Sequence, residues 1–223
     1  MTTLRSDAPV THMIVLPGGG YAEHTAHEAE PVTSWLGEIG VPASVFRYPV
    51  NVRHPAPLDA LRAEIARRRA AGAERIGLIG FSAGGHLAGL AALAPGAAPD
   101  QTAQFAVLGY AITSMQTQTY RPARLILLGE HASPALRRST SLDALPVLRD
   151  LLPAIRVRVH IFAAADDPLV PVSNGTYLAE RIPGSELTIL PAAHFAWEEV
   201  PDQFAAIIAD LVTRTETEWV RPG

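Results

Sequence analysis

The sequence G-F-S-A-G, residues 80–84, constrains most strongly what this chain can fold into. An apolar run, 76–79, precedes it and has the character of a buried strand, and the small-residue run 83–93 that follows has the character of a helix. A serine at such a corner is typical of a nucleophile elbow. Strand and helix come so close there that side chains at Gly80 and Gly84 would collide. The motif therefore predicts that Ser82 points outward at a helix N-terminus, where negative charge is favoured.

Strand-like and helix-like segments alternate along the whole chain of 223 residues. Apolar runs of strand length occur at 12–16, 41–48, 76–79, 105–110, 157–163 and 186–190, with helix-like segments between most of them. This alternation predicts an α/β fold with a mostly parallel, doubly wound sheet of about six strands. The length suits a single domain, 1–223, in which about 111–153 has no clean period and is expected to form a small cap-like excursion with short helices.

Residues with catalytic potential follow the expected strands. They are the glycine loop P-G-G-G-Y at 17–21, Ser82, the pair Asp166-Asp167, and His194. Because the carboxyl ends of parallel strands meet at one edge of a sheet, and sites form at that edge, these residues are expected to lie close together.

Serine is a weak nucleophile unless a base removes its proton, and that base is usually a histidine oriented by a carboxylate. In this type of fold the chain order is serine, acid, histidine. Of eight histidines, only His194 lies beyond both Ser82 and the aspartate pair. Either Asp166 or Asp167 could face it; we choose Asp167 because it opens the loop D-P-L-V-P. Two plainer interpretations stay open: Ser82 only caps a helix, and the aspartates only stabilise a turn.

Acyl transfer also needs hydrogen-bond donors for an oxyanion. The glycine loop at 17–21 offers backbone N–H groups without side-chain obstruction, and Ala83 offers one at the helix N-terminus. A phosphate loop is the other interpretation of a glycine triplet. It is disfavoured because no Lys-Ser or Lys-Thr pair follows and the dinucleotide pattern G-x-G-x-x-G is absent.

Composition removes several classes of function. The absence of cysteine excludes disulfides, thiolate metal sites and a cysteine nucleophile. His24 and His27, with the glutamates around them, match no common zinc spacing, so no metal or cofactor is expected. The net charge of −4 and the lack of a basic block argue against nucleic acid or an anionic membrane as partner. No segment has the pattern of a signal peptide or a membrane span, so a cytoplasmic location is expected.

Taken together, these segments resemble the α/β-hydrolase superfamily, specifically its bacterial acetyl esterase and acetylxylan-esterase-like branch. The matching stretches include P-G-G-G-Y, I-G-L-I-G-F-S-A-G-G-H-L-A, L-L-G-E-H-A-S-P-A-L-R-R and A-D-D-P-L-V-P-V-S-N, in the right order over most of the chain. The resemblance implies a nucleophile, an acid, a base and three oxyanion N–H donors. By position these are Ser82, Asp167, His194 and the amides of Gly19, Gly20 and Ala83.

Three departures from that pattern have consequences. Pro17 stands where related esterases often carry histidine, so the resemblance does not say how the glycine loop is braced. The surroundings of the base, A-A-H-F-A-W, replace the usual G-H-G, which implies a different leaving-group geometry. The stretch before residue 12 is too short for the usual leading antiparallel strands. We therefore expect a reduced sheet and a homodimer that covers an exposed edge strand.

The prediction is a metal-free serine hydrolase that cleaves small-acyl carboxylic esters through an acyl-enzyme. Its partner would be a small-molecule ester, with an acylated sugar as one candidate. A peptidase or dienelactone-type hydrolase on the same scaffold, or a non-catalytic binding protein, are the alternatives. Six residues are candidates for the substrate pocket, although each is also an ordinary core residue. They are Tyr21, Tyr110, Met115, Leu169, Phe195 and Trp197.

Overall fold

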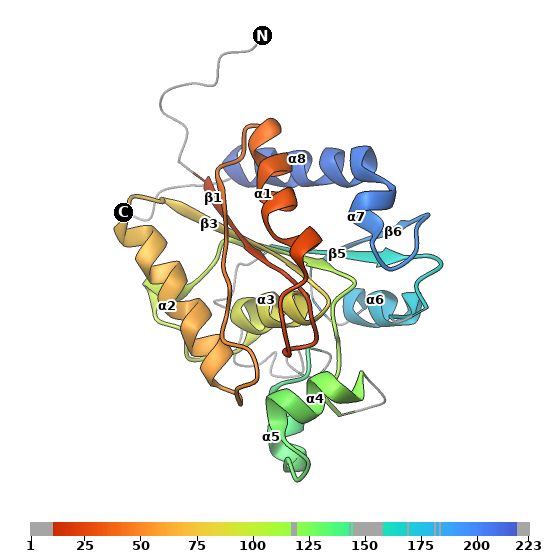
Figure 1. Ribbon diagram of the computed structural model, residues 1–223. Coiled ribbons are helices and arrows are strands. Elements are labelled where there is room, and N and C mark those ends of the chain that lie inside the picture. Colours follow the sequence, from red (N-terminus) through yellow and green to blue (C-terminus); the bar gives the residue numbers. More distant parts are fainter. Residues whose placement is uncertain are drawn as a thin grey trace.

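The computed structural model describes residues 11–116, 120–142, 144, 158–168, 170–180, 182 and 184–217. Within these ranges six strands form one sheet in the order β2-β1-β3-β4-β5-β6, and every neighbouring pair is parallel (Figure 1). The strands are β1 (Thr11–Leu16), β2 (Ala43–Val45), β3 (Arg75–Phe81), β4 (Phe105–Gly109), β5 (Arg158–Ala164) and β6 (Glu186–Leu190). The predicted parallel α/β sheet is therefore confirmed.

Helices cover both faces of this sheet, as Figure 1 shows. One face carries α2 (Ala56–Ala70), α3 (Ala83–Leu93) and α6 (Val172–Ala179), and the other carries α1 (Glu30–Glu38) and α8 (Pro201–Thr217), with the short α7 (Ala196–Glu199) beside α8. Each face has its own apolar core. All residues of β3 and of α3 are buried, because both elements lie in the middle of these layers. None of the helices in the described ranges is long and apolar enough to cross a bilayer.

Two elements differ from the sequence-based expectation. The strand expected over 41–48 is only Ala43–Val45, since it lies at the sheet edge and pairs with β1 alone. Beyond it the backbone of Phe46 still donates to Val15, but Tyr48 already donates back to Phe46 in a turn. Helix α7 was not expected, because four residues are too few to show a helical period. The homodimer that would cover an edge strand stays a prediction.

The region after β4 contains two short helices, α4 (Arg121–Leu128) and α5 (Pro134–Ser139). Ala123 and Leu127 of α4 pack into the core on the α2–α3 face. Leu142 follows α5 and lies directly over Gly89 of α3, where a Cβ would come within 2.6 Å of it. Residues 117–119, 143 and 145–153 of the predicted excursion lie outside the described residues.

The turn between β3 and α3 has the strained backbone that the sequence predicts. Ser82 has φ 49° and ψ −113°, a conformation that residues with side chains rarely adopt. A Cβ on Gly80 would lie 2.3 Å from the Gly84 carbonyl oxygen, and one on Gly84 would lie 2.1 Å from the Leu16 carbonyl oxygen. Both contacts are with backbone atoms, so no side-chain rotation relieves them. The two glycines therefore allow β1, β3 and α3 to converge directly beneath Ser82.

Replacing Gly84 by alanine should destabilise the protein. Overpacking a filled site costs about 1–3 kcal/mol and sometimes more, and here the obstacle is backbone of β1 and the loop after it. Gly37 is the matched control, because it lies in α1 and an added methyl group would meet nothing within 4 Å. Gly37→Ala should be neutral or stabilise by about 0.5–1 kcal/mol. Urea unfolding followed by circular dichroism gives both values. Equal stability of the two variants would contradict this account of the turn.

Candidate active site

The residues singled out in the sequence lie at the carboxyl edge of the sheet. The loop 17–21 follows β1, Ser82 follows β3, Asp167 follows β5 and His194 follows β6. All strands run in the same direction, so these four segments leave the sheet at the same side (Figure 1). Topology therefore brings together groups that are far apart in the sequence.

His194 is held by a buried aspartate. Its Nδ1–H donates to Asp167 Oδ2 at 2.8 Å, and the Asp167 side chain has no solvent exposure, against 13% for His194. The other oxygen, Oδ1, accepts from the backbone N–H of Val170 at 2.9 Å. Asp166 is exposed. The structure thus pairs His194 with Asp167 and not with its neighbour. With Nδ1 as donor, Nε2 of the same ring carries the lone pair that a base requires.

Ser82 and His194 are connected through Tyr110. The backbone N–H of Ser82 donates to the carbonyl of Gly109, the residue before Tyr110. The Tyr110 ring packs against the His194 ring with centroids 4.6 Å apart. Among the hydrogen bonds of the described residues, none joins Ser82 Oγ directly to His194. Such bonds are often long without substrate and tighten in the Michaelis complex.

The glycine loop lies over the serine. A Cβ on Gly18 would be 3.2 Å from Ser82 Cβ, so the loop and the elbow are in contact. Gly19, Gly20 and Tyr21 have φ of 114°, 63° and 64°, a left-handed run that glycine adopts without strain at two of the three positions. In the described part of the chain, the N–H groups of Gly19, Gly20 and Ala83 donate no hydrogen bond. These are the three N–H groups that the family resemblance names as oxyanion donors.

Three buried side chains brace this loop, and they supply what the departure at Pro17 left open. Tyr48 donates its hydroxyl to the Pro17 carbonyl at 2.7 Å. Glu28 accepts from the Gly18 N–H at 2.7 Å. Tyr21 donates to His86 Nδ1, also at 2.7 Å. The bracing role of Glu28 and Tyr48 was missed in the sequence, where Glu28 looks no different from the glutamates on either side of it.

His86 joins the loop to the region after β4. It is completely buried, its Nδ1 accepts from Tyr21 and its Nε2–H donates to the Thr140 carbonyl at 2.7 Å. Burial lowers the pKa of His86 to about 4, although the Thr140 carbonyl favours the charged ring. The imidazole is therefore neutral at pH 7 and serves as a structural hydrogen-bonding group.

The residues proposed for the substrate pocket lie in different places. Tyr21 and Met115 are buried in the core, and Trp197 packs against the core on the other face. Leu169 lies outside the described residues.

Phe195 is 39% exposed and meets the His194 ring edge-on, with centroids 5.2 Å apart. Sequence reasoning missed Tyr120, whose 57%-exposed side chain lies 3.1 Å from a Cβ placed on Gly20. Two exposed aromatic rings therefore flank the site.

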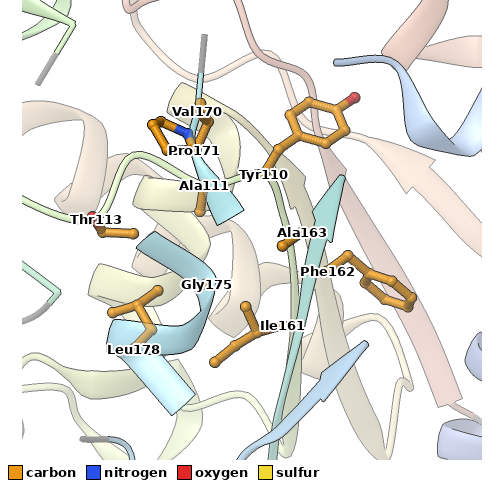
Figure 2. A pocket seen from close by; sticks show the side chains of 10 residues that line it. All are labelled: Tyr110, Ala111, Thr113, Ile161, Phe162, Ala163, Val170, Pro171, Gly175 and Leu178. Carbon is orange, nitrogen blue, oxygen red and sulfur yellow. The ribbon is translucent and has the colours of Figure 1, made fainter. Parts of the chain in front are cut away.

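Tyr110 also borders a small pocket between β5 and α6, shown in Figure 2. Its wall includes Ile161, Ala163, Gly175 and Leu178, but neither Ser82 nor His194. Because neither of these two residues lines it, we do not place the substrate in this pocket. No cluster of three or more His, Asp or Glu side chains suited to a metal ion occurs in the described ranges.

The buried neutral state of His86 predicts a pH dependence of stability. The unfolded chain binds a proton at the ordinary histidine pKa of 6.5, but the folded protein does so only near 4. The unfolded state therefore holds more protons between these values, and stability falls as pH falls from about 6.5 to about 4. At about 1.4 kcal/mol for each unit of pKa difference, the loss is about 3 kcal/mol. Urea unfolding of wild type and His86→Gln from pH 7 to pH 4 tests this. Parallel curves for the two proteins would contradict it.

The sequence resembles part of a known xylanase. No protein-family model matches the chain. An endo-1,4-beta-xylanase B of Butyrivibrio fibrisolvens is 25% identical over 205 residues, covering 83% of this chain and 31% of the xylanase. The chain thus spans about a third of the length of that curated relative.

Solved structures agree over nearly the whole chain. An acetyl ester-xyloside bifunctional hydrolase from Caldicellulosiruptor lactoaceticus superposes with a TM-score of 0.81 at 28% identity, covering 95% of this chain and 85% of that one. A truncated carbohydrate esterase from gut microbiota gives 0.76 at 16% identity over 97% and 88%. A carboxylesterase from Lactobacillus plantarum WCFS1 gives 0.66 at 21% over 98% and 89%. The chain therefore has the α/β-hydrolase fold of these esterases.

Proposed function

We propose that this protein is a serine esterase that cleaves small-acyl, acetyl-type carboxylic esters. The observation that carries the proposal is the combination of Ser82 on a strained elbow with a buried Asp167–His194 pair at the same sheet edge. Buried aspartate, oriented imidazole and exposed nucleophile are the parts that serine hydrolases need. The similarity to a carboxylesterase and to a carbohydrate esterase supports ester hydrolysis.

The proposed reaction proceeds in two halves. Ser82 Oγ attacks the acyl carbon while His194 Nε2 takes the hydroxyl proton. The imidazolium, stabilised by Asp167, then protonates the departing alkoxide, which leaves an acyl-serine. In the second half His194 removes a proton from water, the hydroxide adds to the acyl carbon, and Ser82 recovers its proton as the carboxylic acid leaves.

The oxyanion of each tetrahedral intermediate would accept from the N–H groups of Gly19, Gly20 and Ala83. These groups donate to no other atom in the described part of the chain, and two of them lie on the loop that covers Ser82. One such donor contributes about 3–4 kcal/mol to the transition state. Because Ala83 begins helix α3, the helix N-terminus adds to the stabilisation of negative charge.

An acylated sugar is the ester substrate that we favour, with a sugar hydroxyl as its alcohol component. Tyr120 exposes its ring beside Gly20, and Phe195 exposes its ring beside His194. Flat apolar faces of this kind can be covered by a ring-shaped ligand. Two of the similar structures are named as an acetyl ester-xyloside hydrolase and a carbohydrate esterase. A peptidase or dienelactone-type hydrolase would use the same serine, but nothing in the geometry favours either. The intact Asp167–His194 pair speaks against a non-catalytic binding protein.

Hydrolysis of p-nitrophenyl acetate, butyrate and octanoate, and acetate release from acetylated xylose, should show the highest kcat/KM for acetyl esters. Ser82→Ala or His194→Ala should lower kcat by about 10⁴–10⁶-fold, and Asp167→Asn by about 10⁴-fold, as in other such triads. The controls Ser34→Ala and His131→Ala change exposed residues on α1 and between α4 and α5, so their activity should equal wild type.

Equal activity of wild type and Ser82→Ala would refute Ser82 as nucleophile. A wild type that cleaves none of these acetyl, butyryl or octanoyl esters but cleaves a peptide or a dienelactone in a Ser82-dependent way would replace the esterase by one of its alternatives.

A further inference from the structure

Glu28 is a buried acid for which the proposed reaction gives no role. It ends the short 3-10 helix at 26–28 and is only 1% exposed. An isolated carboxylate is costly to bury unless hydrogen bonds compensate it. Glu28 has two of them: Oε2 accepts from the Gly18 N–H at 2.7 Å and Oε1 from the Tyr110 hydroxyl at 2.6 Å. One carboxylate thus joins two segments that lie on different sides of Ser82.

The first of these segments is the glycine loop. A Cβ on Gly18 would lie 2.7 Å from Glu28 Oε2 and 3.2 Å from Ser82 Cβ, so carboxylate, loop and serine are packed together. The loop then takes the left-handed backbone of Gly19 and Gly20. A glycine backbone can adopt several other conformations, and the hydrogen bond from Gly18 to Glu28 reduces their number. Glu28 therefore helps to fix the direction of the following N–H groups.

The second segment is Tyr110, which follows β4. It has φ 35°, an unfavourable value for a residue with a side chain, and its ring lies 4.6 Å from that of His194. Burial, together with the charge of Glu28, raises the pKa of Tyr110 well above its ordinary value, so its hydroxyl keeps its proton and remains a donor. The hydrogen bond to Glu28 thus holds a ring that packs directly against the proposed base.

We propose that Glu28 and Tyr110 are a pair of positioning residues that keeps the oxyanion loop and the His194 ring in register with Ser82. The inference rests on the proposed function and deepens it. Neither side chain needs to touch the substrate. They act because an error of about 1 Å in the placement of catalytic groups can cost about 10²-fold in rate.

The test is a double-mutant cycle with Glu28→Gln and Tyr110→Phe, with p-nitrophenyl acetate as substrate. Glutamine has an NH₂ group in place of one carboxylate oxygen, so one of the two contacts, to the Gly18 N–H or to the Tyr110 hydroxyl, loses its acceptor. Phenylalanine keeps the aromatic ring of Tyr110 but lacks the hydroxyl donor. A fluorophosphonate titration, read by intact mass, counts reactive serines, so kcat is expressed per competent site. Glu38→Gln and Tyr177→Phe make the same chemical changes at exposed positions and serve as controls.

We expect kcat per site to fall about 10–100-fold in Glu28→Gln and about tenfold in Tyr110→Phe. KM should change little, because the lost alignment matters in the transition state. The double variant should be within about twofold of Glu28→Gln, since the two side chains form one connection. A merely structural role would lower the number of labelled sites or the unfolding midpoint and leave kcat per site unchanged.

Three results would overturn the inference while the proposed function survives. The first is an active wild type with both single variants within about twofold of its kcat per site. The second is a loss of activity explained entirely by a smaller number of labelled sites. The third is a double variant in which the two single losses of kcat multiply. If Glu28→Gln does not fold, Tyr110→Phe alone decides, by the same criterion. A wild type without ester turnover would overturn the proposed function itself, and this inference with it.

Discussion

The close approach of β1, β3 and α3 at Gly80 and Gly84 is the constraint on which the site depends. Where glycine Cβ atoms would lie 2.1–2.3 Å from backbone oxygens, no other residue fits. This contact forces the sharp turn that gives Ser82 its φ of 49°. The strain is sustained because both flanking elements are wholly buried. The position of the serine is therefore a property of the core and not of a surface loop.

Around that turn, buried hydrogen bonds, in addition to apolar packing, hold the loops in place. Tyr48, Glu28 and the Tyr21–His86 pair each hold one part of the glycine loop, and Asp167 holds His194. Except for the Glu28–Gly18 contact, which lies within the connection between β1 and α1, these contacts join different connections or a connection to a helix. Buried hydrogen bonds in a low-dielectric interior are costly to leave unmade, so such a network favours one arrangement over others. It gives loops at the sheet edge the rigidity that an oxyanion site needs.

Much of this arrangement could be predicted from the sequence because its signals are local or topological. The alternation of apolar runs predicted the parallel sheet, and the elbow spacing predicted the strained turn at Ser82. Chain order alone selected His194, and the structure then paired it with Asp167. The edge strand was predicted too long, since an apolar run does not reveal where pairing ends. Glu28 and Tyr110 meet across 82 positions of sequence, and no local pattern distinguishes them from an exposed acid or an ordinary core tyrosine.

The most direct test of the central claim, convergence of these segments on Ser82, is a crystal structure of the protein phosphonylated by a fluorophosphonate. The adduct should be on Ser82, with the phosphonyl oxygen about 2.7–3.1 Å from the Ala83 nitrogen and from Gly19 or Gly20. His194 should keep its bond to Asp167 and direct Nε2 towards the adduct. A label on another residue, or a phosphonyl oxygen pointing into solvent with His194 turned away, would contradict the account.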